Sequence, residues 1–320
     1  MFSSCNKGRY IQPGDTLDVA YKKAMRFYSQ EKYSDAASAF ETVVNMGRGT
    51  DYSRDAQFRL AESYYNNRQY LLAASEYQRY NSLFPQSERR QQVDFKRAMC
   101  YYNLSPRYKL DQKHTRKAIE LFQLYLSRYP DADNASDAAT YIDQMREKLA
   151  HKIFGAADLY KRIDQYDAAA IYYGMVIDKY PETSWAEKAL VEQMHAYILY
   201  ADNSVVGKMK ERYNKALSSY ETYLQLFPNG NNRSLAEQYR DRAKAGVKEA
   251  ERLEKQGGRD EDKITFLGMT IDLGFLSAER DSIRPAADTT MPANLPESPV
   301  GSPQSGGQGQ GGMPQGQGGM

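Results

Sequence analysis

The segment Tyr166 to Pro181, with the sequence YDAAAIYYGMVIDKYP, contains the pattern that decides the fold. Ala169 is followed four residues later by an aromatic, Tyr173, and the segment closes with an aromatic and a proline. Residues i and i+4 share one helix face, so the alanine lets a neighbouring helix approach closely while the ring fills the space beside it. Because proline cannot continue a helix, the segment ends at a fixed place. The pattern predicts the second helix of a packed helix pair.

The same pattern occurs four times with twelve residues from alanine to proline, and a fifth copy lacks the proline. Upstream of each copy lies another small residue, 12 residues before the motif alanine in copies one, two and four and 20 before it in copies three and five. Two helices per unit at a period of 34 residues or more are typical of tetratricopeptide repeats. The sequence therefore predicts an all-α, right-handed α-solenoid of about five tetratricopeptide-like helix pairs. The predicted repeat-core positions are Ala24, Ala36, Phe40, Ala61, Ala73, Tyr77, Pro85, Ala98, Ala118, Phe122, Pro130, Ala157, Ala169, Tyr173, Pro181, Ala196, Ala216, Tyr220 and Pro228.

Breaks in the pattern predict four segments. Residues 1–15 are a lipoprotein-type N-terminus and tether, 16–130 hold repeats one to three, 131–256 hold repeats four and five with a capping helix, and 257–320 are a mostly disordered tail rich in Gly, Pro and Gln. An eight-residue insertion divides the two helices of repeat three, and residues 134–145 predict either an additional helix or an extension of the next one. Within the tail, alternating apolar residues over 263–276 indicate a short strand or a docking segment.

Composition argues against several function classes. Lys and Arg total 43 and Asp and Glu total 41, a balance that does not favour nucleic acid as a partner. The two cysteines exclude a disulfide scaffold, and Cys100 is predicted to be structural. The three histidines lie in different repeats without a ligand partner at metal-binding spacing, and no catalytic motif occurs. We therefore predict a protein that is not an enzyme and needs no metal or cofactor.

The surface expected to carry function is the concave side of the solenoid, which the first helix of each pair lines. Aromatic residues three before and four after the small residue of that helix repeat at intervals of 37 in the first three units. Such an aromatic ladder would suit an extended, apolar-rich peptide, although the same positions also suit packing against the next helix. The predicted groove residues are Tyr21, Met25, Tyr28, Phe58, Glu62, Tyr65, Phe95 and Tyr102.

The N-terminus contains Phe2-Ser3-Ser4-Cys5, which resembles the end of a bacterial lipoprotein signal peptide. In such a peptide, small residues precede the cleavage site and the cysteine thiol carries a diacylglycerol. Cys5 is therefore the predicted lipidation site, and each buried methylene of its acyl chains would contribute about 0.8 kcal/mol to membrane anchoring.

Over about residues 5–256, the five repeats, the extended fourth unit and this cysteine resemble the BamD family, the tetratricopeptide-repeat lipoproteins of the barrel assembly machinery. The segment from Ala150 to Phe154, followed by Ala157 and Tyr160, looks especially like that family's fourth repeat. The resemblance implies a non-catalytic scaffold, lipid-anchored on the periplasmic face of the outer membrane. Its N-terminal repeats would bind unfolded outer-membrane proteins, and residues 134–256 would dock on a BamA-like barrel insertase. The alternative is another tetratricopeptide adaptor of the cell envelope or the cytoplasm.

Overall fold

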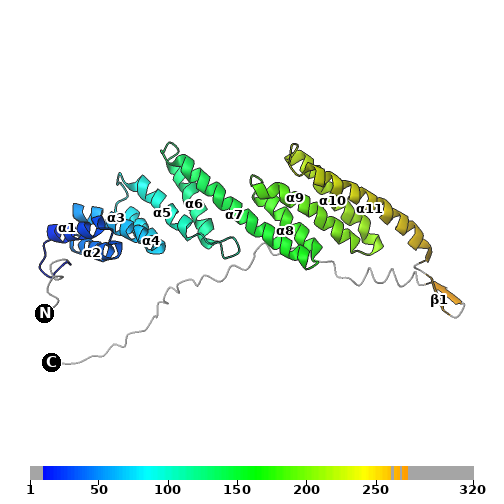
Figure 1. Ribbon diagram of the computed structural model, residues 1–320, viewed down its shortest axis with the longest axis horizontal. Coiled ribbons are helices and arrows are strands. Elements are labelled where there is room, and N and C mark those ends of the chain that lie inside the picture. Colours follow the sequence, from blue (N-terminus) through cyan, green and yellow to red (C-terminus); the bar gives the residue numbers. More distant parts are fainter. Residues whose placement is uncertain (1–9, 261–262, 267–268, 273–320) are drawn as a thin grey trace, which may run out of the picture. The chain divides into compact units, whose positions relative to one another are not determined.

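The computed structural model describes residues 10–260, 263–266 and 269–272. Within these ranges the chain forms eleven helices and two short strands (Figure 1). The helices are α1 (Leu17–Ser29), α2 (Tyr33–Met46), α3 (Asp51–Asn66), α4 (Tyr70–Leu83), α5 (Arg90–Leu104), α6 (Lys113–Arg128), α7 (Ala135–Arg162), α8 (Tyr166–Lys179), α9 (Ser184–Asp202), α10 (Val206–Leu226) and α11 (Arg233–Asp260). The strands are β1 (Lys263–Phe266) and β2 (Met269–Asp272).

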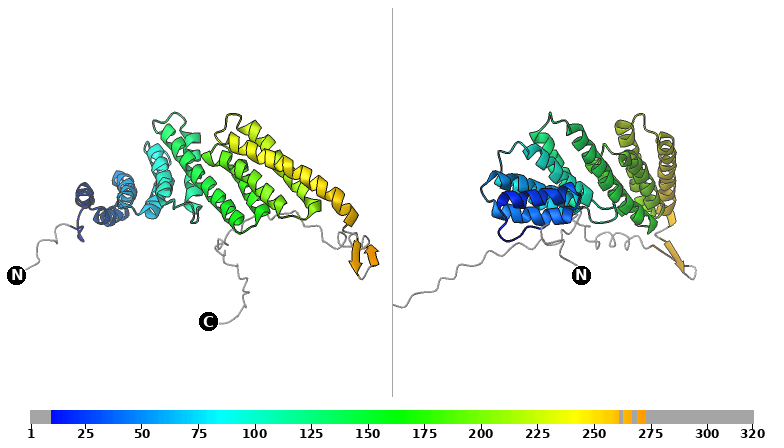
Figure 2. Two further views of the ribbon diagram at one scale, coloured as in Figure 1. Left: turned by 45° about the vertical axis from the view of Figure 1, so that its right-hand side comes forward. Right: turned by 60° about the vertical axis from the view of Figure 1, so that its left-hand side comes forward.

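Helices α1 to α10 form five antiparallel pairs, and each helix packs against the next one in the chain (Figures 1 and 2). The pairs are α1/α2, α3/α4, α5/α6, α7/α8 and α9/α10, which match the five sequence repeats. The predicted all-α solenoid of tetratricopeptide-like pairs is therefore confirmed for this part of the chain. None of the helices in the described ranges has the length and hydrophobicity needed to cross a membrane.

The alanines of the repeat pattern and their aromatic partners form the core. All ten alanines have no exposed surface, and the five motif aromatics are between 0% and 7% exposed. Cys100 is also fully buried, and burial raises the pKa of its thiol to about 12. Small residues are needed where helices cross closely, because a larger side chain would push the axes apart.

The four motif prolines, in contrast, are exposed and do not belong to the core. Each follows the C-cap residue of the second helix of its pair. These four end residues share one backbone conformation, with φ between −128° and −140° and ψ between 53° and 63°; they are Phe84, Tyr129, Tyr180 and Phe227. A residue before proline is held out of the α region, so these four copies leave their helices in the same way.

The short turns inside repeats one, two and four also share one geometry. Glu31, Arg68 and Asp164 occupy the left-handed region, with φ values of 57°, 60° and 59°. One left-handed residue is enough to reverse the chain after a helix, which explains the constant spacing of 12 between the two alanines. Repeat three replaces this turn with the longer connection 105–112.

Helix α7 is 28 residues long and begins at Ala135, so the additional residues before repeat four extend its first helix. Its N-terminal half contributes Ala138, Ile142 and Met145 to the core of repeat three. Its C-terminal half contributes Ala150 and Ala157 to the core of repeat four. One uninterrupted helix therefore serves two repeats.

Helix α11 covers the end of the fifth repeat with a stripe of small residues. Ala236, Ala243 and Ala250 lie seven apart and have no exposed surface, and the first two pack with tyrosines of α10. The sequence predicted a break at Gly257-Gly258, but the helix continues to Asp260. Glycine lowers helix stability by about 1 kcal/mol without any steric clash, so it weakens a helix without having to end it.

Contacts divide the chain into two units, 1–254 and 255–320. In the second unit β1 pairs antiparallel with β2, with Lys263 opposite Asp272. The segment therefore contains the strand that the sequence predicts. Cys5 and the tail beyond residue 272, which the sequence predicts to be disordered, lie outside the described residues.

Candidate functional site

The eight predicted groove residues lie on α1, α3 and α5, the first helices of three consecutive repeats. Phe58 and Glu62 are buried, with 5% and 8% of their surface exposed. The other six are partly exposed. We call the six aromatics of this set the aromatic ladder; they are Tyr21, Tyr28, Phe58, Tyr65, Phe95 and Tyr102.

The first residue of the ladder belongs to a polar network that links three repeats. The Tyr21 hydroxyl donates to the Asp55 carboxylate, which also accepts from Arg89 at 2.5 Å. Burial alone would raise the pKa of Asp55, but donation by these two partners outweighs it and lowers the pKa. Burial and the same carboxylate raise the pKa of Tyr21 to about 12. The Arg89 guanidinium also lies 4.8 Å from the ring of Phe58, so this network covers the next ring of the ladder.

Three ladder tyrosines each form a hydrogen bond with the following repeat. Tyr28 accepts from the Asn66 amide at 3.2 Å, and Tyr65 accepts from the Asn103 amide at 3.3 Å. Tyr102 donates to Gln144 of α7 at 2.6 Å. Cations of the following repeat lie over two of these rings, Arg59 over Tyr28 at 5.4 Å and Lys96 over Tyr65 at 4.4 Å.

The aromatic ladder therefore combines packing between repeats with partial exposure. Its rings join consecutive repeats, as the packing interpretation of the sequence pattern proposed. Except for the buried Phe58, the rings keep partly exposed edges, and these edges with the hydroxyl, amide and cationic groups around them form a polar and aromatic strip on α1, α3 and α5. Such a strip can hydrogen-bond the main chain of an extended peptide and pack against its apolar side chains.

Glu62 faces the inside of its repeat. It accepts from the hydroxyl of the motif aromatic Tyr77 and lies 3.6 Å from the Lys96 ammonium. Repeat four has the same arrangement, in which Tyr173 donates to Asp158 at 2.5 Å. Burial, with the adjacent acid, raises the pKa of both tyrosines far above the usual range. The acid therefore serves the core of the pair.

Repeats one and three carry an apolar version of this contact. Their motif aromatics are Phe40 and Phe122, which have no hydroxyl, and methionines take the place of the acid. Met25 packs against the core cluster that contains Phe40, and Met99 against the cluster that contains Phe122. Met25, like Glu62, thus contacts the core of its own repeat.

A second surface, not predicted from the sequence, lies where the insertion 105–112 crosses α7. Lys148 donates to the Ser105 hydroxyl at 2.7 Å, and Lys152 donates to the Leu110 carbonyl at 2.8 Å. Burial lowers the pKa of Lys148. Two lysines of α7 therefore hold both ends of the insertion.

The middle of the insertion is held by a stack of three rings from three elements. Tyr108 of the insertion stacks on His151 of α7 with ring centroids 3.7 Å apart, and His151 stacks on Trp185 of α9 at 4.1 Å. Gly155 lies one turn beyond His151, and a Cβ at this position would already be 3.4 Å from the Tyr108 ring. A glycine in the middle of α7 thus lets the tyrosine lie close to the helix.

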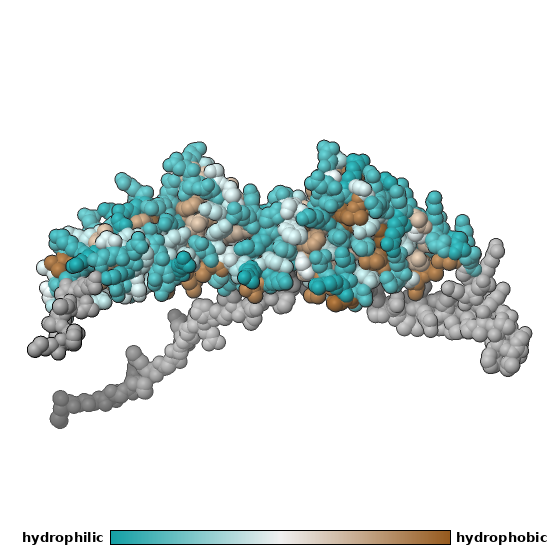
Figure 3. All heavy atoms as spheres, in the orientation of Figure 1, coloured by the Kyte–Doolittle hydropathy of each residue, from teal (hydrophilic) through white to brown (hydrophobic). Residues whose placement is uncertain are grey.

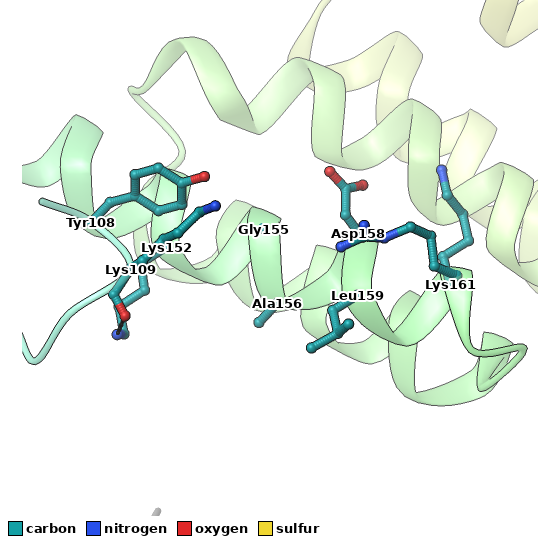
Figure 4. A pocket seen from close by; sticks show the side chains of 9 residues that line it. Tyr108, Lys109, Lys152, Gly155, Ala156, Asp158, Leu159 and Lys161 are labelled. Carbon is teal, nitrogen blue, oxygen red and sulfur yellow. Dashed lines mark hydrogen bonds between the residues drawn. The ribbon is translucent and has the colours of Figure 1, made fainter.

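Two hollows lie on either side of Tyr108. The first, of about 670 Å³, runs over the small residues Gly155 and Ala156 and has basic side chains at both ends (Figure 4). The second, of about 780 Å³, is lined by Leu110, His151 and Trp185 and by the basic residues Arg107, Lys109 and Lys148. We call the two together the insert cleft. Its basic residues are Arg107, Lys109, Lys148, Lys152, Lys161 and Arg162.

The face shown in Figure 3 is mostly hydrophilic, with small and separate apolar areas. In the C-terminal half the largest exposed apolar side chains include Leu159 and Ile163 at the end of α7 and Val205 before α10, which are 51%, 54% and 75% exposed. Among the described residues, no group of three or more His, Cys, Asp or Glu side chains has the geometry of a metal site.

Comparison with known proteins gives one family match and one curated relative. The model of the family described as "YfiO: Outer membrane lipoprotein" matches residues 14–210. The outer membrane protein assembly factor BamD of Caulobacter vibrioides is 29% identical over 104 residues. That alignment covers 32% of this chain and 34% of the relative, so it spans about a third of the relative's length.

Solved structures of similar chains include other tetratricopeptide proteins. The TPR2AB domain of yeast Sti1 in its Hsp90 complex is 15% identical, with a TM-score of 0.33, and covers 78% of this chain and 96% of its own. The P58(IPK) TPR domain is 15% identical, with a TM-score of 0.36, and covers 75% and 66%. A tetratricopeptide protein of Parabacteroides merdae is 13% identical, with a TM-score of 0.31, and covers 71% and 98%.

Proposed function

The chain belongs to the YfiO family of outer membrane lipoproteins, and we propose that it is a non-catalytic scaffold subunit of a barrel assembly machinery. In this role its N-terminal repeats bind unfolded outer-membrane proteins along the aromatic ladder. Its C-terminal repeats dock on a BamA-like barrel insertase. Lipid on Cys5 anchors it to the periplasmic face of the outer membrane.

The single observation that carries the substrate-binding half of this proposal is the exposed strip along α1, α3 and α5. Three tyrosines, Tyr28, Tyr65 and Tyr102, present hydroxyls and ring edges in consecutive repeats. An unfolded barrel strand alternates apolar and polar side chains and has unpaired main-chain groups. The strip offers ring edges to the former and hydrogen-bonding groups to the latter.

The docking half of the proposal is supported by the exposed apolar residues of repeats four and five. Leu159, Ile163 and Ile171, at 51%, 54% and 40% exposure, lie on α7, α8 and the turn between them. Exposed apolar side chains that lie close together in the chain favour a protein interface. The anchor would keep both binding surfaces close to the membrane in which barrels assemble.

Site-specific photocrosslinking tests the division of labour. The photoreactive residue p-benzoylphenylalanine is placed at Tyr65 or Tyr102, and at the exposed Ser75 of the second helix α4 as a control. A urea-denatured outer-membrane barrel protein diluted into buffer should crosslink at the two ladder positions and not at Ser75. Equal crosslinking at all three positions would contradict substrate binding along the ladder.

A second arm tests docking and anchoring in the native envelope. The same photoreactive residue at Ile171 should crosslink to the barrel insertase, and Cys5→Ala should move the protein out of the membrane fraction without removing that crosslink. A crosslink to unrelated proteins alone would refute docking. A Cys5→Ala protein that still sediments with the outer membrane would refute the lipid anchor.

A further inference from the structure

We propose that the insert cleft is a second peptide-binding site, which takes an acidic segment of a partner protein with an apolar side chain beside its acids. This inference uses neither the aromatic ladder nor the family assignment. It rests on the charge of the cleft, on how that charge is held, and on the different lining of its two hollows.

Positive charge is concentrated in the cleft. Six basic side chains and two carboxylates line its two hollows, whereas the whole protein has a net charge of only +2. Both carboxylates are already engaged: Asp158 accepts from Tyr173, and Glu147 accepts from the main-chain N–H and the hydroxyl of Ser184. These donors are neutral, so both carboxylates keep their charge, and the lining still has six cations against two anions.

Three of the four cations that face the first hollow also lack acidic partners. Lys161 is paired with Glu192 at 2.5 Å. Within the described ranges, Lys109, Lys152 and Arg162 form no ion pair of 4 Å or less. Lys152 is held instead by the neutral carbonyls of the insertion, so its position is fixed while its charge stays uncompensated. A fixed, uncompensated cation beside two exposed ones attracts carboxylates strongly, because little ordering is needed on binding.

The second hollow adds an apolar contact beside this charge. Leu110 is 59% exposed at its rim, and the edges of His151 and Trp185 form its wall. Tyr108 separates it from the basic hollow. Neighbouring side chains of an extended peptide point to opposite sides, so a peptide that crosses Tyr108 would place an acid in one hollow and an apolar side chain in the other.

A peptide fits these features better than an anionic lipid does. A headgroup could occupy the basic hollow, but its acyl chains would have to leave toward a bilayer, whereas the apolar hollow adjoins the basic one at Tyr108 and Lys109. An extended peptide can fill both hollows at once. We therefore commit to the peptide and make the lipid an outcome of the test.

Trp185 is the only tryptophan of the chain and lines the second hollow, so its fluorescence reports on the cleft directly. The full-length protein is titrated with a capped synthetic peptide in which Glu and Leu alternate. A saturable change in Trp185 emission is expected, and it should weaken as salt is raised. A peptide in which Lys replaces Glu should cause no change.

The double variant Lys109→Glu/Arg162→Glu should bind the Glu–Leu peptide about tenfold more weakly or worse, since two attractions become repulsions. Both side chains are exposed, so the fold should be kept, which an unchanged Trp185 spectrum without peptide would verify. The matched control Arg48→Glu/Arg68→Glu makes the same charge change in repeats one and two. It should keep the affinity within about twofold.

Three results would overturn the proposal. One is an unchanged Trp185 signal with the Glu–Leu peptide; another is equal affinity of the double variant and the control. The third uses vesicles of phosphatidylglycerol as the probe. If the vesicles bind with a dependence on Lys109 and Arg162 while the peptide does not, the cleft recognises a lipid surface instead.

Discussion

Replacing Tyr77 by Phe removes one hydroxyl from the core of repeat two, and the structure allows the cost to be worked out. That hydroxyl donates to Glu62, which is 8% exposed. The Lys96 ammonium lies 3.6 Å from the same carboxylate. A hydrogen bond to a charged group contributes about 1.5–3 kcal/mol, and a buried carboxylate that loses it is poorly solvated. We expect Tyr77→Phe to lower the free energy of unfolding by about 2 kcal/mol.

Repeats one and three already contain the compensated form, a methionine paired with a phenylalanine. The double variant Tyr77→Phe/Glu62→Met reproduces it in repeat two. Glu62→Met alone leaves the Tyr77 hydroxyl without its acceptor, so each single variant should be destabilised. The double variant should lose less free energy of unfolding than the two single variants together. The coupling energy should be about 1.5 kcal/mol, measured by urea unfolding of the four proteins.

Additive costs in this cycle would refute the reasoning, because they would mean that the tyrosine and the acid stabilise the fold independently. Tyr70→Phe on the same helix is the control. Its ring packs against Tyr65 at 5.5 Å, a contact that phenylalanine keeps, so its effect should stay within about 0.5 kcal/mol.

Three further measurements test other parts of the fold. Arg68→Gly should raise the free energy of unfolding by about 0.5–1 kcal/mol, because glycine adopts the positive φ of 60° at this turn without strain. A lower free energy of unfolding, measured with denaturant, would contradict this. Gly246→Ala should lower the free energy of unfolding by about 2 kcal/mol, since its Cβ would lie 2.3 Å from a buried tyrosine ring. Gly207→Ala is the control; no atom lies within 4 Å of its Cβ, so it should be neutral or stabilising. Equal thermal unfolding of the two variants would show that the cap helix is not packed this way. Burial lowers the pKa of His151 below 6.5, so the ring stack should be fully formed above about pH 6.5 and weaken as pH falls through that lowered value. Trp185 fluorescence should follow this titration and become flat in His151→Phe, and a titration that persists in this variant would assign it to another group.

The repeat architecture could be predicted from the sequence because residues close together in the chain determine how each repeat packs. An alanine and an aromatic four residues apart, such as Ala169 and Tyr173, define a helix face, and the proline that follows defines its end. The structure places every one of these alanines in the core with no exposed surface. The same logic assigned the prolines to the core, although a residue that ends a helix lies at its exposed end.

The site was harder to predict for a physical reason. Whether a tyrosine on a first helix faces a ligand or the next repeat depends on which side chain lies opposite, and Asn66 and Arg59 come from the following helix pair. The sequence predicts Glu62 as a groove residue, whereas in the structure its carboxylate accepts from the Tyr77 hydroxyl. In the sequence, Met25 occurs with the motif aromatic Phe40 and Glu62 with Tyr77. Comparing these two pairs could have revealed that Glu62 contacts the core of its repeat.

The insert cleft has only a weak signature in the sequence. An insertion with one tyrosine, a lone histidine in α7 and the only tryptophan of the chain come from three separate parts of the sequence. Their stacking depends on the path of the insertion across α7, which hydrogen bonds to Lys148 and Lys152 determine. No local periodicity encodes such a path.

Helix α7 has a mechanical consequence for the whole array. With 28 residues and a rise of about 1.5 Å per residue, it is a rod about 42 Å long that is built into two repeats at once. The first helices α3, α5 and α9 also pack on the repeat before their own, but they have only 16, 15 and 19 residues. A change in the angle between repeats three and four must therefore slide the longest of these rods across the core of repeat three or bend it.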